Sequence, residues 1–312
     1  MLYYKFSEYL KNRYGVKVYK IPVNIPVTCP NRDGRISVNG CIFCGDEGAG
    51  FECLPDYMNV SDQIRTNSKY IGEKYKAEKF IVYFQNYSNT YLPLVQFKNY
   101  ISEACGENIA AIYISTRPDC INKEQLGFLK FIKDSEKIDI VIELGLQTVN
   151  YHTLKKLRRG HTLAEFIDAA VSIKGYGLES CAHYIVDLPF DCMDDVVEGA
   201  KVISALGVNQ VKCHSMYILK NTVLGDMYSK GEIVPVSMEE YIERTITFLE
   251  YLSPDIVIQR LIGRAPEERS LFCSWGTSWW KIRDAIEDKM RDEERFQGKR
   301  FHYLDGEACK KD

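Results

Sequence analysis

Short runs rich in valine, isoleucine and tyrosine alternate along the chain with longer stretches in which apolar residues recur every three or four positions. The short runs predict buried strands and the longer stretches predict amphipathic helices. Strands are expected at residues 16–23, 79–85, 110–116, 138–146, 180–189 and 210–219. Helices are expected at residues 61–75, 123–135 and 163–177. Largely apolar strands that alternate with helices favour a parallel sheet covered by helices.

Six strand–helix units between about residues 16 and 220 are too few for a closed eight-unit barrel. They fit a partial (β/α)6 TIM-type barrel of parallel strands. The pattern changes after residue 222, where a helix at 237–252 leads to a strand at 255–263. We therefore predict a barrel core at 1–222 and a C-terminal α/β extension at 223–312, packed on the barrel.

Composition narrows the class of protein. The chain has 312 residues, 46% hydrophobic and 27% charged, as expected of a soluble globular protein. Its formal net charge of −3 means that a nucleic-acid partner would need a local basic patch. No apolar run is long enough to cross a membrane, and the first residues lack the pattern of a signal peptide. Eleven cysteines in such a chain indicate thiols or metal ligands in a reducing cytoplasm.

Three cysteines follow the first predicted strand in CPNRDGRISVNGCIFC, at Cys29, Cys41 and Cys44. Three thiolates can bind a 4Fe–4S cluster and leave one iron open to an external ligand such as S-adenosylmethionine (SAM). The C-terminal ends of barrel strands are where active sites form. Phe43 could cover the cluster and limit access of water. This segment, residues 29–44, is called the cysteine loop.

A structural zinc site is the alternative for the cysteine loop. Its fourth ligand could be Cys53, nine residues further along, or His183 or His214 from elsewhere in the chain. A C-x-x-C pair with a distant third cysteine is a weak signal, so spacing alone leaves the zinc reading open.

The motifs resemble those of the radical SAM superfamily, in which three cysteines with an aromatic before the last occupy this loop. The usual spacing there is three then two residues, and here it is eleven then two. That spacing is similar to the YhcC/YtqA-type (MnmL-like) group, relatives of the Elongator-type radical SAM catalytic subunit that lack its acetyltransferase domain. The matching segments are CPNRDG…GCIFC, YFQNYSNTY, STRPDC, ELGLQT, RRGHT, HYIVDLP and VKCHSMYILKNT.

The resemblance implies a 4Fe–4S cluster and SAM as cofactors, with polar residues at the strand ends around them. Gln85 and Asn86 suit the loop that holds the methionine amino group, although a polar turn that caps the next helix is the alternative. Ser115 and Arg117 follow the third strand, where Arg117 could pair with a carboxylate or form an ordinary ion pair. A buried glutamate is costly unless paired or used, which favours a function for Glu143.

The resemblance further implies that Glu143 and Gln147 contact SAM. Arg159 and His161 could bind its carboxylate or a phosphate. His183 and His214 are either site residues or core histidines. As site residues, His183 would bind the cofactor and His214 would be catalytic. Lys220 is the other candidate catalytic residue beside the three cysteines. Many relatives have glycine where this chain has Asp187, which leaves the packing of the adenine ring open.

The reaction implied is reductive cleavage of SAM to a 5′-deoxyadenosyl radical that modifies the wobble uridine of tRNA, from carboxymethylaminomethyluridine to aminomethyluridine. The partners would be tRNA and an electron donor such as flavodoxin or ferredoxin. RNA binding needs cations and aromatic surfaces, for which the candidates are Lys155, Lys156, Arg158, Lys220, Arg260, Arg264, Tyr87, Tyr91, Tyr217 and Trp275. The alternatives are a radical enzyme acting on a small molecule or protein, and a non-catalytic zinc-stabilised binding module.

Overall fold

The computed structural model describes residues 1–45 and 53–310 and divides into two compact units. The cysteine-loop unit comprises Ser7–Leu146 and Arg158–Cys181. The C-terminal unit comprises Met1–Phe6, Gln147–Leu157 and Ala182–Asp312. Each unit is thus assembled from more than one segment of the chain.

The main sheet has seven strands in the order β1-β2-β3-β4-β5-β6-β8. They are β1 (Val18–Val23), β2 (Lys79–Phe84), β3 (Ile109–Thr116), β4 (Asp139–Gln147), β5 (Glu179–Ile185), β6 (Gln210–His214) and β8 (Val257–Arg260). Strand pairs β1–β2, β2–β3, β3–β4 and β6–β8 are all parallel. The predicted α/β fold of partial-barrel type is confirmed.

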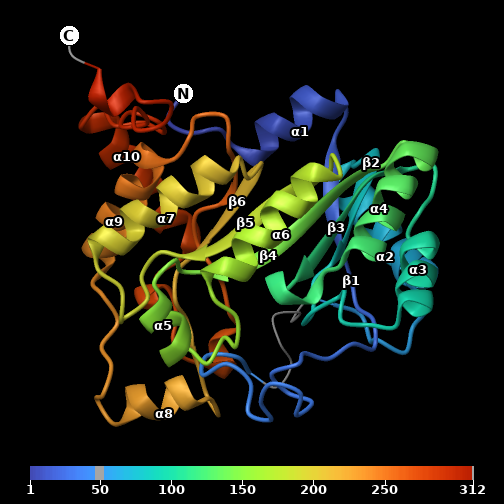
Figure 1. Ribbon diagram of the computed structural model, residues 1–312, viewed down its shortest axis with the longest axis horizontal. Coiled ribbons are helices and arrows are strands. Elements are labelled where there is room, and N and C mark those ends of the chain that lie inside the picture. The colour runs from blue at the N-terminus through green and yellow to red at the C-terminus, as the bar shows by residue number, and fades with distance from the viewer. Residues whose placement is uncertain (46–52, 311–312) are drawn as a thin grey trace. The chain divides into compact units, whose positions relative to one another are not determined.

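The cysteine-loop unit contains the predicted helices α2 (Val60–Tyr75), α4 (Lys123–Glu136) and α6 (Leu163–Gly175). It also contains α1 (Phe6–Tyr14), which precedes β1, and α3 (Leu94–Glu103), and neither of these was predicted. Helices α2, α3 and α4 lie side by side next to strands β1 to β3 (Figure 1). Capping boxes at Asn122 and Thr162 begin α4 and α6, because each side chain accepts a backbone N–H that the helix leaves unpaired.

The core of this unit consists of the strands and the inner faces of these helices. Phe166, Ala170 and Ile173 of α6 are buried at the spacing that the helical pattern predicts. Every residue of β3 is buried, including the large side chain of Tyr113. Burial of one such large side chain contributes about 1.5–3 kcal/mol to the stability of the fold. The buried strands therefore hold the residues at their ends in defined positions.

The C-terminal unit contains helices α5 (Tyr151–Lys156), α7 (Met193–Leu206), α8 (Val223–Ser229), α9 (Met238–Tyr251) and α10 (Trp279–Asp292). Helix α9 packs against both α7 and α10. A short antiparallel ribbon joins β7 (Ile218–Leu219) to β9 (Ser270–Phe272). The run predicted as one strand at 210–219 is therefore two strands, β6 and β7, in different sheets.

Strand β8 differs from the prediction in its place. The sequence pattern assigned residues 255–263 to the extension, but β8 pairs with β6 in the main sheet. Burial of Val257 and Ile258 explains the pairing, since an apolar strand gains most by joining an existing sheet edge. None of the helices in the described part of the chain is both long and apolar enough to span a bilayer.

Candidate active site

The cysteine loop follows β1 and is folded by hydrogen bonds of its own backbone. The amides of Arg32 and Asp33 donate to the Cys29 carbonyl at 2.7 and 3.3 Å. The Cys44 amide donates to the Cys41 carbonyl at 3.1 Å. Cys41 is buried, whereas Cys29 and Cys44 are half-buried. Two turns thus present three thiols from one loop, with Cys41 the least exposed.

The three thiols lie close enough to influence one another's ionisation. Burial, and then the neighbouring Cys41 thiol, raise the pKa of Cys44 to about 11. The positive charges of Arg32 and Arg159 lower this pKa, and Cys29 raises it. Crowded thiols of this kind become thiolates readily when a metal centre neutralises them.

The loop after β2 carries buried polar atoms that fit a ligand. Asn89 fastens this loop, because its side-chain amide donates to three backbone carbonyls at 3.0, 2.8 and 2.9 Å. Ser88 Oγ and Asn86 Oδ1 are buried and have no hydrogen-bond partner among the described residues. An unsatisfied buried polar atom costs about 1–3 kcal/mol, so both suit a polar group of a cofactor. Predicted Gln85 is half-buried beside them.

The loop after β2 and the cysteine loop are neighbours. The Arg32 guanidinium lies 5.7 Å from the centre of the Tyr87 ring, within the range of a cation–π contact. A cavity of about 560 Å³ is lined by Pro30 and Ile36 of the cysteine loop, by Tyr91 of the loop after β2 and by Cys120 after β3. The two loops thus border the same cavity.

Arg117, which follows β3, is almost fully buried and uses its guanidinium within the protein. Its Nε and Nη2 bind the two carboxylate oxygens of Asp119 at 2.9 and 2.7 Å. Its Nη1 donates to the Arg159 carbonyl at 2.6 Å. The guanidinium thus forms a bidentate ion pair with Asp119. This is the ordinary ion pair that the sequence analysis gave as the alternative to binding a ligand carboxylate. Cofactor binding by Arg117 stays a prediction that requires this pair to open.

Glu143 lies in β4 and is fully buried. Its Oε1 is 2.8 Å from Lys20 Nζ on β1, and Ser115 Oγ donates to Oε2 at 3.5 Å. Lys20 also lies over the rings of Tyr83 and Tyr113, at 4.7 and 4.1 Å from their centres. The buried carboxylate is thus neutralised by a cation that the sequence analysis missed. The available signal was a lysine between apolar positions of the first strand.

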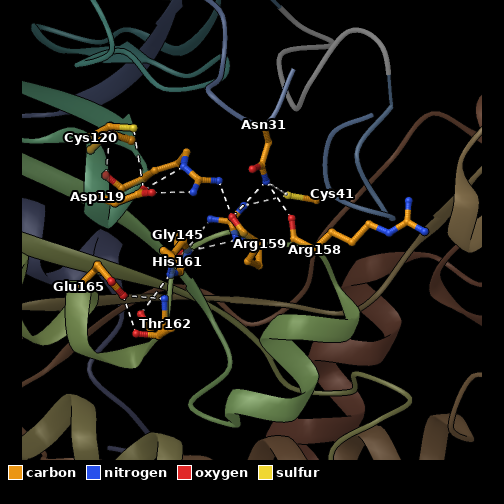
Figure 2. Close-up of polar contacts among 12 residues, drawn as sticks. Asn31, Cys41, Asp119, Cys120, Gly145, Arg158, Arg159, His161, Thr162 and Glu165 are labelled. Carbon is orange, nitrogen blue, oxygen red and sulfur yellow. Dashed lines mark hydrogen bonds and ion pairs between the residues drawn. The ribbon is translucent and has the colours of Figure 1, made fainter. Parts of the chain in front are cut away.

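The RRGHT turn (residues 158–162) docks on the cysteine loop. Figure 2 shows Asn31 and Arg159 directed at Cys41, while the side chain of Arg158 extends away. Asn31 Nδ2 is 3.3 Å and Arg159 Nη1 is 3.5 Å from Cys41 Sγ. Asn31 Nδ2 also donates to the carbonyls of Arg158 and Arg159 at 2.8 and 3.0 Å. Asn31 had not been expected in the site.

His161 holds the guanidinium of Arg159 in place. Arg159 Nη2 donates to the Gly145 carbonyl at 3.0 Å, and Nε donates to His161 Nε2 at 3.2 Å. Burial, and then the charge of Arg159, lower the pKa of His161 to about 3. The neutral ring can donate from Nδ1 to the Thr162 carbonyl, 3.2 Å away, which leaves Nε2 as an acceptor for Arg159.

Other predicted residues lie in the C-terminal unit. Gln147 ends β4 with a positive φ of 71°. The rings of His183 and His214 lie with centres 5.3 Å apart, and Arg260 Nη2 is 2.8 Å from His214 Nδ1. Lys220 is exposed, and its Nζ donates to a backbone carbonyl at 2.8 Å. The structure therefore brings the two histidines together and holds Lys220 on a surface turn.

Asp187, two residues beyond β5, is fully buried. Its Oδ1 accepts the Met216 amide at 2.6 Å, and its Oδ2 has no hydrogen-bond partner among the described residues. Burial raises the pKa of this carboxyl to about 7. Asp187 therefore fastens the segment after β6 in a way that glycine could not.

Comparisons with known proteins agree with this geometry. The model of the Radical SAM superfamily matches residues 24–203, more than half of the chain, and that of the Radical_SAM C-terminal domain matches residues 208–292. The chain belongs to the radical SAM superfamily. Members of this superfamily use a 4Fe–4S cluster and SAM, so the zinc-stabilised binding module is set aside.

YtqA of Bacillus subtilis is 29% identical over 308 residues, which cover 98% of this chain and 95% of YtqA. The tRNA uridine(34) acetyltransferase of Methanocaldococcus jannaschii is 27% identical over 167 residues, covering 53% of this chain and 30% of that protein. The solved structure of Elp3 from Methanocaldococcus infernus aligns with a TM-score of 0.69 at 16% identity, over 90% of this chain and 64% of Elp3. This structural similarity confirms the fold.

The residues present fit the two cofactors of the superfamily. Cys29, Cys41 and Cys44 would hold the cluster and leave an open iron. The orphaned oxygens of Ser88 and Asn86 would accept hydrogen bonds from the amino group of SAM. The chain thus provides thiols and hydrogen-bond acceptors on two neighbouring loops, as these two cofactors would require.

Proposed function

We propose that this radical SAM enzyme modifies the wobble uridine of tRNA, converting carboxymethylaminomethyluridine to aminomethyluridine. The observation that carries the proposal is the similarity of about half of the chain to a tRNA uridine(34) acetyltransferase. The chain shares with that protein 53% of its own length but spans only 30% of the acetyltransferase. The partial match would be explained if the two proteins share a related core that acts on the same nucleoside but carries out a different reaction.

When bound and reduced by one electron, the cluster and SAM would supply a 5′-deoxyadenosyl radical able to remove a hydrogen atom beside the substrate amine. Return of one electron to the flavodoxin or ferredoxin and addition of water would then break the C–N bond, release the two-carbon unit as glyoxylate and leave the aminomethyl group. The protein's own residues would bind and orient the cofactor and the substrate, and would exclude water from the reaction. Phe43, half-buried in the cysteine loop, would limit access of water to the cluster, and Gln147 and His183 lie in the strands β4 and β5 near which SAM is expected. His214, whose ring Arg260 orients, and Lys220 are the candidates to hold or move protons at the substrate amine.

The C-terminal unit offers a surface suited to RNA. Trp279 and Trp280, at the start of α10, are 38% and 42% exposed. The guanidinium groups of Arg264 and Arg283 lie 5.1 and 5.4 Å from the Trp279 ring centre, and Lys281 Nζ lies 5.7 Å from that of Trp280. Exposed rings flanked by cations stack bases and attract phosphates. The sequence analysis missed this pair, whose signal was adjacent tryptophans followed by a lysine.

The earlier aromatic candidate Trp275 has a different role. Its indole Nε1 donates to the Val236 carbonyl at 2.8 Å, and its ring packs on Tyr241 and Phe272. Trp275 is therefore occupied by internal packing. The proposed RNA surface moves along the chain to Trp279 and Trp280.

The reaction is tested with anaerobically reconstituted protein, SAM, a reductant and bulk tRNA rich in carboxymethylaminomethyluridine. Nucleoside mass spectrometry should show aminomethyluridine and an accompanying rise in 5′-deoxyadenosine. The variant with Cys29, Cys41 and Cys44 changed to Ala should form neither. Deoxyadenosine that appears only with a protein or small-molecule fraction would transfer the activity to the alternative substrate class.

RNA binding is tested with Trp280→Ala, beside Tyr57→Ala as a control at an exposed aromatic of the other unit. Loss of one stacked base costs about 1–3 kcal/mol, so Trp280→Ala should weaken tRNA binding about tenfold. Tyr57→Ala should bind tRNA as the unchanged protein does. Equal affinity of both variants across a range of salt concentrations would remove this surface from the proposal.

A further inference from the structure

Asn31 and Arg159 converge on Cys41, the most buried of the three cluster cysteines. Their nitrogen atoms lie 3.3 and 3.5 Å from its sulfur, which is within reach of N–H···S hydrogen bonds. Three acceptors surround Asn31 Nδ2, namely this sulfur and two carbonyls. The amide orientation is thereby fixed, since the reversed amide would point its oxygen at three acceptors.

Arg159 is engaged within the protein at all three guanidinium nitrogens, through three of its five N–H groups. Its Nη1, Nη2 and Nε each have an acceptor: the Cys41 sulfur, the Gly145 carbonyl and His161. The residue is only 7% exposed. An arginine held at three nitrogens by buried partners is a fixed positive charge beside a thiolate.

The backbone around Arg159 is fixed just as closely. Its carbonyl accepts from Arg117 and Asn31 at 2.6 and 3.0 Å. Gly160 has a φ of 73°, and a Cβ at this position would come within 2.8 Å of Asn31 Oδ1 and of Ile36 Cγ2. The turn therefore needs a glycine to approach the cysteine loop, and this approach brings Arg159 to Cys41.

We propose that Arg159 and Asn31 are positioning residues for the Cys41 thiolate, and that they set the reduction potential of the cluster instead of binding the carboxylate of SAM. Reduction adds one negative charge to the cluster and its thiolates. N–H donors and a buried cation beside a thiolate favour the reduced state, and so raise the potential. The inference rests on the cluster of the superfamily and is independent of the RNA substrate.

The test uses Arg159→Met and Asn31→Leu, which replace each donor with an apolar side chain of similar size. Arg159→Lys keeps the charge but loses the planar fork. Arg158→Gln is the matched control, because Arg158 loses its charge in the same turn while its side chain is exposed and directed away from Cys41. Each anaerobically reconstituted protein is poised at a series of potentials, and the reduced cluster is measured by electron paramagnetic resonance.

Arg159→Met should lower the equilibrium constant for reduction about tenfold, a fall of about 59 mV for a one-electron couple. Asn31→Leu and Arg159→Lys should give smaller shifts in the same direction, and Arg158→Gln none. Equilibrium dialysis should give a dissociation constant for SAM within twofold of the unchanged protein. An unchanged potential with a tenfold weaker affinity for SAM in Arg159→Met would overturn the proposal and assign Arg159 to SAM.

Iron analysis and circular dichroism distinguish a local effect from misfolding. A folded Arg159→Met protein that keeps fewer irons than Arg158→Gln would support the role at Cys41, since the thiolate then depends on its donors. If Arg159→Met fails to fold, the reduction potentials of Arg159→Lys and Asn31→Leu test the proposal instead. Wild-type potentials in both of these would refute the proposal.

Discussion

Two arginines with little exposure, Arg159 in the cysteine-loop unit and Arg295 in the C-terminal unit, have opposite kinds of partner. Arg295 donates to Glu243 and Glu250 at 2.7 and 2.9 Å. Arg159 donates to a sulfur, a carbonyl and a neutral histidine, and forms no ion pair with a carboxylate in the described part of the chain. A poorly solvated charge is costly unless an opposite charge lies beside it.

The difference shows how a site can be distinguished from a structural network. The group around Arg295 is complete without a ligand, because carboxylates neutralise the guanidinium. The group around Arg159 is completed only when its neighbouring thiols are thiolates that hold a metal centre. A buried cation whose own protein supplies no carboxylate therefore indicates ligand chemistry, whereas a neutralised one indicates stability.

The largest expected effect is the loss of the cluster from the cysteine loop, without a loss of stability. Changing Cys29, Cys41 and Cys44 together to Ala should remove all cluster iron and abolish formation of 5′-deoxyadenosine. Iron and sulfide analysis after anaerobic reconstitution measures the first, and chromatography of the products measures the second. The melting temperature of the apoprotein should change little, because no metal is lost from it.

Cys309→Ala is the control for this triple variant, since Cys309 is an exposed thiol outside the loop. It should retain about four irons per chain, the content of one 4Fe–4S cluster. Iron retained by the triple variant would mean that other thiols hold the cluster.

The next largest effect is a loss of stability when the ion pairs of Arg295 are broken. Arg295→Met leaves Glu250, whose side chain is 1% exposed, with only the more distant Arg300. Breaking a buried ion pair by removing one partner costs about 3–5 kcal/mol, and Arg300 places the expected loss near the lower end. Urea unfolding should show this loss, while cluster content and reduction potential of the folded protein stay the same.

The double variant Arg295→Met with Glu250→Gln tests the cause. It should recover part of the lost free energy of unfolding, because the stranded charge is gone. A reduction potential altered by Arg295→Met would break the contrast between the two arginines.

A smaller effect sharpens the role of the RRGHT turn. Gly160→Ala places a Cβ 2.8 Å from Asn31 Oδ1, whereas Gly177→Ala meets nothing within 4 Å. Both glycines have a positive φ, 73° and 69°, so both variants bear a similar strain of about 1–2 kcal/mol. Only Gly160→Ala should also lose iron during gel filtration. Equal iron retention in the two variants would show that the turn does not position the loop.

The last effect is a pH dependence in the C-terminal unit. Burial raises the pKa of Asp187 to about 7, above its value of roughly 3.9 in the unfolded chain. The folded state then binds one more proton than the unfolded state between these values. Stability from this group is therefore full below pH 4 and is lost as pH rises to about 7.

Asp187→Asn removes this dependence while its side-chain oxygen can still accept the Met216 amide. The variant should gain about 2–3 kcal/mol of stability relative to the unchanged protein between pH 5 and pH 8, measured by urea unfolding at both pH values. A constant difference between the two proteins would mean that Asp187 ionises normally in the folded state.

Much of the fold and part of the site follow from local sequence. Periodicity located helices α2, α4, α6 and α9 to within a few residues. In α4, α6 and α9 the apolar positions that recur at helical spacing are buried. The order of the sheet was less accessible. The sequence predicted the strand at residues 255–263, but only the pairing of β8 with β6 shows that this strand belongs to the main sheet.

The sequence by itself determined that three cysteines share one loop, that a carboxylate lies in a buried strand at Glu143, and that polar residues follow the strands. These are properties of spacing and of period. Only the tertiary structure decided that Lys20 neutralises Glu143 and that Arg159 meets Cys41, 118 positions away in sequence. Such contacts depend on how loops pack at the ends of neighbouring strands, and the hydrophobic pattern of a single chain carries no information about that packing.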